Sequence, residues 1–147
     1  MIFNIAEMTR EHTKKLAELE KVCFSTPWSE SGLNEEIENS QSHFIVAENE
    51  SDILGYIGVQ EIWGEAYITN IAVFPKYRRQ GVAQMLLQRA IDGAKSRDCV
   101  FITLEVRKSN LNAIALYNKF DFKNVGERKN FYTNPTENAI IMTKNFN

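Results

Sequence analysis

Residues 70–83 read NIAVFPKYRRQGVA, and the architecture of the chain follows from this stretch. The strand-like segment 67–73 passes through Pro75 into a basic turn, and a helical pattern starts near Gly81. Apolar residues then recur at helical spacing, at Ala83, Leu86, Leu87, Ala90, Ile91 and Ala94. A second apolar strand follows at 100–106. A strand, a helix and a strand in this order predict two parallel neighbouring strands joined by a right-handed crossover.

The flanking segments extend this unit into a mixed sheet. Thr9 and Ser29 are candidate N-caps for two early helices. Short polar links predict an antiparallel meander of strands at 43–48, 53–62 and 67–73, and further strands are expected near 122–126 and 139–143. The sequence therefore predicts one α+β domain over residues 1–147, an α/β three-layer arrangement with a mostly antiparallel central sheet and about four helices.

Composition excludes several classes of protein. The chain has 147 residues, of which 44% are hydrophobic, with a net charge of −2 and a pI near 5.8. Nucleic acid and anionic membranes require a concentrated basic surface, so neither is an expected partner. The spacing of Cys23 and Cys99 and the presence of two histidines predict neither a disulfide framework nor a metal site. The chain has no signal-peptide pattern, so we expect it in the cytoplasm. We also expect it to be a monomer.

The turn 78–84 is built like an anion site. Gly81 and Ala83 add little side-chain bulk where the long helix starts, and Arg78 and Arg79 precede them. A helix N-terminus offers unpaired N–H groups and the positive end of the helix dipole, so a phosphate group could approach the backbone here. The alternative is that Gly81 merely eases a tight turn and the arginines are solvated. The P-loop and Rossmann motifs are both absent.

A second polar cluster lies in residues 104–117, which read LEVRKSNLNAIALY. On a strand, Glu105 faces away from Leu104 and Val106, at the end of the expected parallel pair. Asn110 precedes a helix that carries Tyr117 on its apolar side. Each residue also has a purely structural alternative: Glu105 could pair with Arg107, Asn110 could cap the helix, and Tyr117 could be a core aromatic.

These two clusters resemble motifs A and B of the GNAT acetyltransferases, because RRQGVA fits the pattern [RQ]xxGx[GA]. The resemblance implies the GNAT fold, with the parallel strands splayed at an acetyl-CoA site. It also implies that the turn holds the pyrophosphate and that the preceding strand and Asn110 hold the pantetheine arm. The implied cofactor-binding residues are Ile71, Ala72, Val73, Arg78, Arg79, Gln80, Gly81, Val82, Ala83, Gln84 and Asn110.

The chemistry needs a base and an acid. An α-amino group has a pKa of about 7.7–8.0, so it must lose a proton before it can attack a thioester. We expect Glu105 to be the base, directly or through water, and Tyr117 to protonate the departing thiolate. A route through an acyl-cysteine at Cys23 or Cys99 is disfavoured because no histidine lies near either in sequence.

Within that family the chain is most similar to the RimI subfamily, which acetylates the N-terminal alanine of a small-subunit ribosomal protein. Residues 23–30, 104–117, 128–132 and 137–142 carry the similarity. It implies an acceptor slot between a loop with Trp28 and a loop with Phe131 and Tyr132. Trp28 and Tyr132 could instead be core or lid residues. Asp121 and Phe131 depart from the usual glycine and tyrosine. Two other functions remain open: acetylation of lysine, a polyamine or another small amine, and CoA binding without catalysis.

Overall fold

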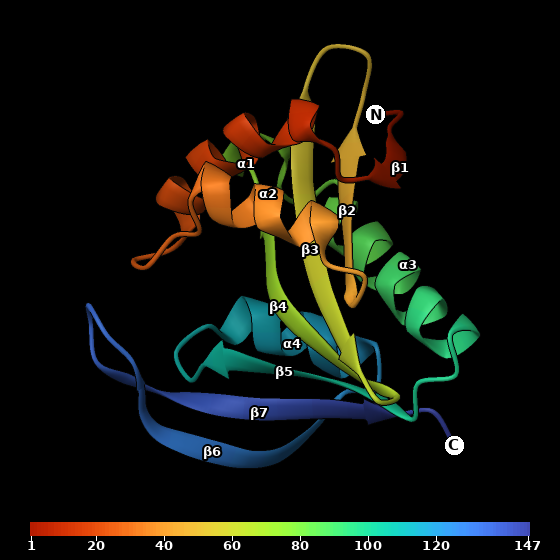
Figure 1. Ribbon diagram of the computed structural model, residues 1–147. Helices are drawn as coiled ribbons and strands as arrows, with labels where there is room; N and C mark the ends of the chain where they lie inside the picture. The colour runs from red at the N-terminus through yellow and green to blue at the C-terminus, as the bar shows by residue number, and fades with distance from the viewer.

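The computed structural model describes residues 1–147, and its strands form one sheet in the order β1-β2-β3-β4-β5-β7-β6 (Figure 1). The strands are β1 (Asn4–Glu7), β2 (Ser42–Glu48), β3 (Ile53–Ile62), β4 (Glu65–Val73), β5 (Phe101–Arg107), β6 (Lys123–Tyr132) and β7 (Glu137–Asn145). Neighbouring strands are antiparallel except for β4 and β5, which are parallel. The expected mixed sheet with one parallel pair is confirmed.

The helices are α1 (Arg10–Cys23), α2 (Glu30–Glu38), α3 (Val82–Ser96) and α4 (Leu111–Lys119), with a short 3-10 helix η1 (Pro75–Tyr77) before α3. The expected caps are present: the side chains of Thr9 and Ser29 accept backbone N–H bonds from the first turns of α1 and α2. Asn110 caps α4 in the same way, which was the structural alternative for this residue. No helix has both the length and the apolar character needed to cross a membrane.

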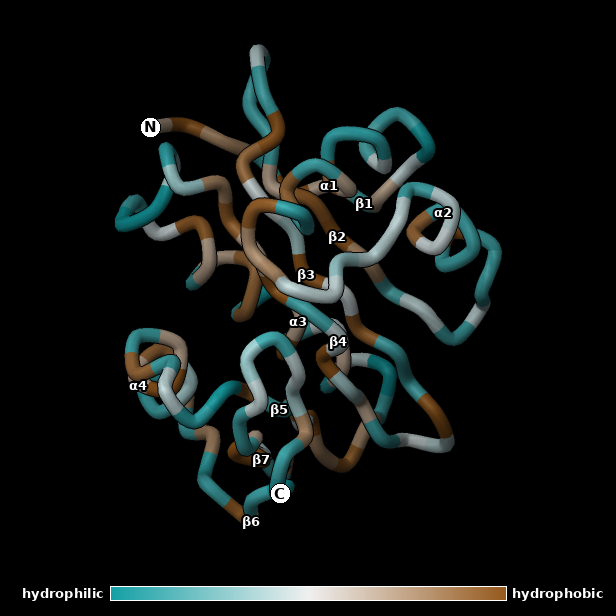
Figure 2. The backbone as a smooth tube through the Cα atoms, turned by 90° about the vertical axis from the view of Figure 1, so that its left-hand side faces the viewer, coloured by the Kyte–Doolittle hydropathy of each residue, from teal (hydrophilic) through white to brown (hydrophobic).

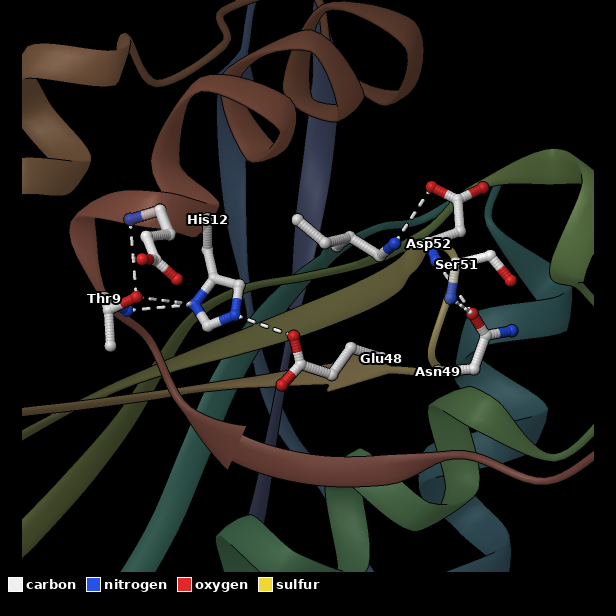
Figure 3. A network of polar contacts seen from close by, with 8 residues as sticks. Thr9, His12, Glu48, Asn49, Ser51 and Asp52 are labelled. Atoms are coloured by element: carbon white, nitrogen blue, oxygen red, sulfur yellow. Dashed lines mark hydrogen bonds and ion pairs between the residues drawn. The ribbon is translucent and has the colours of Figure 1, made fainter.

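The start of α1 is also fixed to strand β2 by a histidine. His12 Nδ1 accepts the backbone N–H of Thr9 at 2.9 Å, and its Nε2 contacts Glu48 Oε1 at 2.9 Å (Figure 3). Asp52, in the turn between β2 and β3, accepts the hydroxyl of Tyr77 at 2.7 Å. These contacts attach α1 and η1 to the β2–β3 hairpin, so both elements keep a fixed position beside β4.

Helices cover both faces of the sheet. One core lies between α3, α4 and the sheet, and Leu86, Leu87 and Ile102 are fully buried in it. The other core lies under α1 and α2 and contains Leu16 and Leu33. Hydrophobic stretches run along strands β2 and β3 between these layers (Figure 2). Burial of a leucine or isoleucine side chain stabilises the fold by about 1.5–3 kcal/mol, so the two cores hold the sheet rigidly.

Strands β4 and β5 pair only where they begin. The parallel register joins Glu65 to Phe101, Ala66 to Ile102 and Tyr67 to Thr103, and no pairing follows. Beyond this point β4 runs on to Val73 and β5 to Arg107, and the two strands diverge (Figure 1). The sheet therefore has a V-shaped opening between residues 70–73 on one arm and 104–107 on the other.

A β-bulge in β4 sits at the start of this opening. Gly58 pairs with Asn70 and Val59 with Ile68, so Thr69 has no partner on β3. A Cβ on Gly58 would approach the Phe44 ring to 2.5 Å and Thr69 Oγ1 to 2.6 Å, so only glycine fits opposite the bulge. Bulges bend a strand and increase its twist, which helps to turn β4 away from β5.

Two expectations from the sequence were wrong in detail. The strand expected to end near residue 126 continues as β6 to Tyr132, because register shifts after Asn124 and Arg128 keep its irregular polar sequence paired with β7. Tyr132 is thus the end of a strand rather than part of a loop. Gly81 precedes α3 as its N-cap, with φ of 81°, instead of lying in the first helical turn.

Candidate active site

The turn before α3 presents a run of unpaired backbone N–H groups. From residue 79 to residue 84, no N–H donates to an acceptor within the protein, and no side chain caps the helix. Arg79 and Gly81 both have left-handed backbone conformations, with φ of 62° and 81°. A Cβ on Gly81 would meet no atom within 4 Å, so the space above the turn is open. This arrangement suits an anionic group.

The basic side chains of the turn have different environments. Arg78 donates through Nε to the carbonyl of Val73 at 3.1 Å and lies 3.4 Å from Cys23 Sγ, so it ties the turn to β4 and α1. Gln80 donates to the carbonyl of Lys76 at 3.3 Å. Arg79 is exposed and makes neither a hydrogen bond nor an ion pair. Its guanidinium is therefore available to a ligand.

Residues Ile71, Ala72 and Val73 form the arm of β4 that faces the opening. On one side they pair with Ile57, Tyr56 and Gly55 of β3, respectively. On the other side β5 has already diverged, so this edge of β4 has no neighbouring strand. Such an edge can bind an extended ligand through main-chain hydrogen bonds.

Glu105 lies on the opposite arm, with its side chain about a third exposed. Its Oε2 accepts from Arg128 Nε at 2.9 Å, and the side chain retains 33% of its accessible surface. Arg128 comes from β6, two strands away, whereas the partner considered from the sequence, Arg107, turns toward the connection between β6 and β7. Glu105 is therefore an accessible carboxylate with one charged partner.

Tyr117 is buried by the tight end of α4. The N–H of Phe122 bonds to the carbonyl of Tyr117, and that of Asp121 to the carbonyl of Asn118, both at 3.1 Å. Asp121 adopts the left-handed conformation expected at this position, with φ of 68°. The Tyr117 ring packs on Phe122 with centroids 5.8 Å apart, and burial raises its pKa well above the ordinary value. Its hydroxyl makes no hydrogen bond within the protein, so its proton is available.

Tyr132 lies near enough to Glu105 and Tyr117 to interact electrostatically with both. Burial, and then the negative charge of Glu105, raise the pKa of Tyr132 to about 12. Tyr132 in turn contributes to the raised pKa of Tyr117. The structure thus brings Glu105, Tyr117 and Tyr132 into one neighbourhood, although they come from β5, α4 and β6.

Arg107 joins the two loops at the mouth of the opening. Its guanidinium stacks 4.5 Å from the centre of the Tyr132 ring and donates to the carbonyl of Thr133 at 3.0 Å. It also contacts Ser25 Oγ at 3.3 Å, and Ser25 itself donates to the carbonyl of Thr133 at 3.1 Å. The loop 24–29, expected to flank an acceptor, therefore meets the turn 133–136, which directly follows Tyr132.

Trp28 lies in that loop and is half-buried. Its ring packs on Phe44 with centroids 5.7 Å apart, at the edge of the core under α1 and α2. Its backbone N–H donates to Glu20 Oε1 at 2.9 Å. Contact of Trp28 with a substrate stays a prediction.

A buried polar network was missed in the sequence. Glu20 is only 1% exposed, and its carboxylate also accepts from Tyr56 and Asn70. One signal could have revealed it: Glu20 lies four residues after Leu16, on the apolar side of α1. A carboxylate in that position requires partners from other elements.

Comparison with known proteins agrees with this geometry. The profile of the Acetyltransferase (GNAT) family matches residues 13–122. A Bacillus subtilis (strain 168) protein, a candidate [ribosomal protein bS18]-alanine N-acetyltransferase, is 37% identical over 139 residues, covering 94% of this chain and 92% of its own. The [ribosomal protein bS18]-alanine N-acetyltransferase of Escherichia coli (strain K12) is 36% identical over 126 residues, covering 84% of each chain.

Solved structures show that the fold is similar as well as the sequence. The crystal structure of the ribosomal-protein-S18-alanine N-acetyltransferase from Escherichia coli superimposes with a TM-score of 0.89 at 30% identity, over 98% of this chain and 94% of that one. The match thus covers nearly the whole of both chains. With a family profile spanning most of its length, this chain belongs to the GNAT family of acetyltransferases, enzymes that take the acetyl group from acetyl-CoA.

Proposed function

We propose that this enzyme acetylates the N-terminal α-amino group of a protein, and that its acceptor is the N-terminal alanine of ribosomal protein bS18. The observation that carries the proposal is the V-shaped opening, with unpaired N–H groups on one arm and a carboxylate with two tyrosines on the other. The printed names of the relatives supply the acceptor. We infer one catalytic domain over residues 1–147, acting as a monomer in the cytoplasm.

The arm of β4 and the turn before α3 would hold acetyl-CoA, which supplies an activated thioester carbonyl. The N–H groups of Arg79, Gln80, Gly81, Val82, Ala83 and Gln84 bind the pyrophosphate, with Arg79 adding charge and Arg78 holding the turn in place. The backbone of Ile71, Ala72 and Val73 binds the pantetheine arm along the free strand edge. Asn110 uses Oδ1 to cap α4, which leaves its side-chain N–H₂ group to contact the same arm.

Glu105 acts as the general base, directly or through one water. The acceptor arrives mainly as an ammonium ion, because an α-amino group has a pKa of about 7.7–8.0. Glu105 is accessible and already binds the cationic Arg128, so the incoming ammonium can replace that guanidinium and then give up its proton. The neutral amine can then attack the thioester carbonyl.

Tyr117 supplies a proton to the departing thiolate. Burial raises its pKa, so the hydroxyl stays protonated at every pH at which the enzyme works. The hydroxyl has no acceptor within the protein, so a sulfur beside it would be its first partner. Without this group the charge of the departing thiolate would stay uncompensated.

The slot between loop 24–29 and the end of β6 would hold the acceptor peptide. Tyr132 keeps its hydroxyl proton because its pKa is raised to about 12, so it can donate to a peptide carbonyl. Trp28 contributes one wall of the slot through its loop. Arg107 and Ser25 hold the two walls together at a fixed separation.

One assay tests the acceptor. Purified enzyme is incubated with acetyl-CoA and a peptide that begins with alanine, and CoA release is measured. The control is the same peptide with a blocked N-terminus and an internal lysine. We expect release only with the free N-terminus. Release with the blocked peptide would assign the enzyme to lysine or small-amine acetylation, and no release with any amine would indicate a CoA-binding domain without catalysis.

A further inference from the structure

The carboxylate of Glu20 is buried among hydrogen-bond donors and has no cationic partner. The residue is 1% exposed, and none of the ion pairs of the protein includes it. It accepts from Trp28 N at 2.9 Å, from the Tyr56 hydroxyl at 2.7 Å and from Asn70 Nδ2 at 2.9 Å. Burying a charge without a counter-ion is unfavourable unless hydrogen bonds satisfy it, so these bonds must keep their geometry.

The three donors come from parts of the molecule that are far apart in sequence. Trp28 belongs to loop 24–29, Tyr56 to β3, and Asn70 to β4 directly after the bulge at Thr69. Asn70 Oδ1 also accepts from Thr69 Oγ1 at 2.8 Å, so the network continues into the bulge itself. Glu20 therefore connects the proposed acceptor loop to the strand that would carry the acetyl donor.

Packing alone does not require this arrangement. The neighbouring inward positions of α1, Leu16 and Leu19, are apolar and completely buried. An apolar residue in place of Glu20 would fill the same layer without a desolvation penalty, as replacement of buried ionic groups often does. The carboxylate adds directional hydrogen bonds, because each bond fixes one donor group at a defined position.

We propose that Glu20 is a positioning residue for acetyl transfer: through Trp28 and Asn70 it holds the acceptor loop at a fixed distance from the donor arm. This inference rests on the proposed function, since it assumes that loop 24–29 lines the acceptor slot. The pyrophosphate turn at residues 79–84 is built from backbone groups that do not touch Glu20. Residues 71–73, which would hold the pantetheine arm, are positioned by their pairing with β3 rather than by Glu20. Loss of the network should therefore affect the acceptor and change acetyl-CoA affinity little.

The test is Glu20→Gln, which keeps the shape of the side chain but turns an N–H₂ group toward donors. We expect kcat/KM for the acceptor peptide to fall at least about tenfold, while the Kd for acetyl-CoA stays within about twofold of wild type. Tyr56→Phe removes one donor and keeps the ring, so it should lower the same ratio by about two- to fivefold. If Glu20→Gln does not fold, the Tyr56→Phe variant tests the proposal instead. Peptide kinetics equal to wild type in Tyr56→Phe would overturn it.

A matched control is Glu36→Gln. Glu36 on α2 also accepts from another element, with Gln60 and Ser42 each at 2.6 Å, but it contacts neither loop 24–29 nor β4. We expect it to lower thermal stability and to leave the peptide kinetics unchanged. Equal losses in the Glu20 and Glu36 variants, or an equal loss of acetyl-CoA affinity, would reduce Glu20 to a structural role.

The same experiment separates the two proposals. If the wild-type enzyme does not acetylate the alanine peptide, the proposed acceptor is wrong. The ratio of variant to wild-type kcat/KM is then measured on the amine that the wild type does acetylate, and a ratio near one overturns the role of Glu20 alone.

Discussion

The two arms of the V-shaped opening present different kinds of chemical group. The arm of β4 and the turn before α3 offer backbone N–H groups and a free strand edge. Apart from the charge of Arg79, their side chains matter chiefly for conformation and space. The arm of β5, with α4 and β6, offers the side chains of Glu105, Tyr117 and Tyr132. An arm that binds through its backbone tolerates any residue that keeps the backbone conformation. An arm that acts through its side chains requires particular functional groups. Substitutions on the two arms should therefore have separable effects.

The largest effect should come from Glu105→Gln. Removing a general base lowers turnover by about 10²–10⁴-fold, and acetyl-CoA affinity should stay the same because that arm is untouched. Initial rates of CoA release and an acetyl-CoA titration measure the two quantities. Glu127→Gln is the control, since Glu127 pairs with Lys108 on the exposed side of β6. Near-normal turnover in Glu105→Gln would exclude Glu105 from the mechanism.

Gly81→Ala should show the opposite pattern. A left-handed conformation is unfavourable for alanine by about 1–2 kcal/mol, so the turn should shift and acetyl-CoA should bind about tenfold more weakly. The turnover of the saturated enzyme should change little. Gly126→Ala is the matched control, because its φ is not positive and its Cβ would lie 3.7 Å from Ile141. A loss of turnover without a loss of affinity would contradict the division between the arms.

Tyr132→Phe should have a smaller effect, confined to the acceptor. The ring keeps its contacts with Arg107 and Phe131, and only the hydroxyl is lost. One hydrogen bond is worth about 0.5–1.5 kcal/mol, which corresponds to a rise of about two- to twelvefold in KM for the peptide. Steady-state kinetics with varied peptide at saturating acetyl-CoA measures it. A peptide KM equal to that of wild type would remove Tyr132 from acceptor binding.

Asp121→Gly should change stability alone. Asp121 holds φ of 68° at the end of α4, where glycine is favoured, so the substitution should stabilise the protein by about 0.5–1 kcal/mol. Its carboxylate is 78% exposed and lies 4.0 Å from Lys144 Nζ, so loss of this ion pair should matter little. Thermal unfolding measures the gain, and kinetics should match wild type. A lower melting temperature would mean that the contact with Lys144 outweighs the backbone strain.

The difference between the arms also explains what could be predicted from the sequence. The turn at Gly81 and the cap at Asn110 are local, because a few consecutive residues determine each, and both were found. The partner of Glu105 was not found, since Arg128 reaches it across β7 through a register that shifts within β6. The spacing of Glu20 after Leu16 indicates a buried carboxylate, but it does not identify the residues from other elements that bind it.

The brief pairing of β4 with β5 has a thermodynamic consequence. Strands β1 to β4 and strands β5 to β7 are joined by hydrogen bonds over only the first residues of one parallel pair. A donor molecule lying between the diverging ends would bridge these two parts, so its binding energy also resists their separation. At a concentration of about 100 Kd, acetyl-CoA should stabilise the protein by about 2.7 kcal/mol. Amide hydrogen exchange along the free edge of β4 should slow accordingly. The bound substrate would then fill the gap in the sheet and add to the stability of the enzyme that uses it.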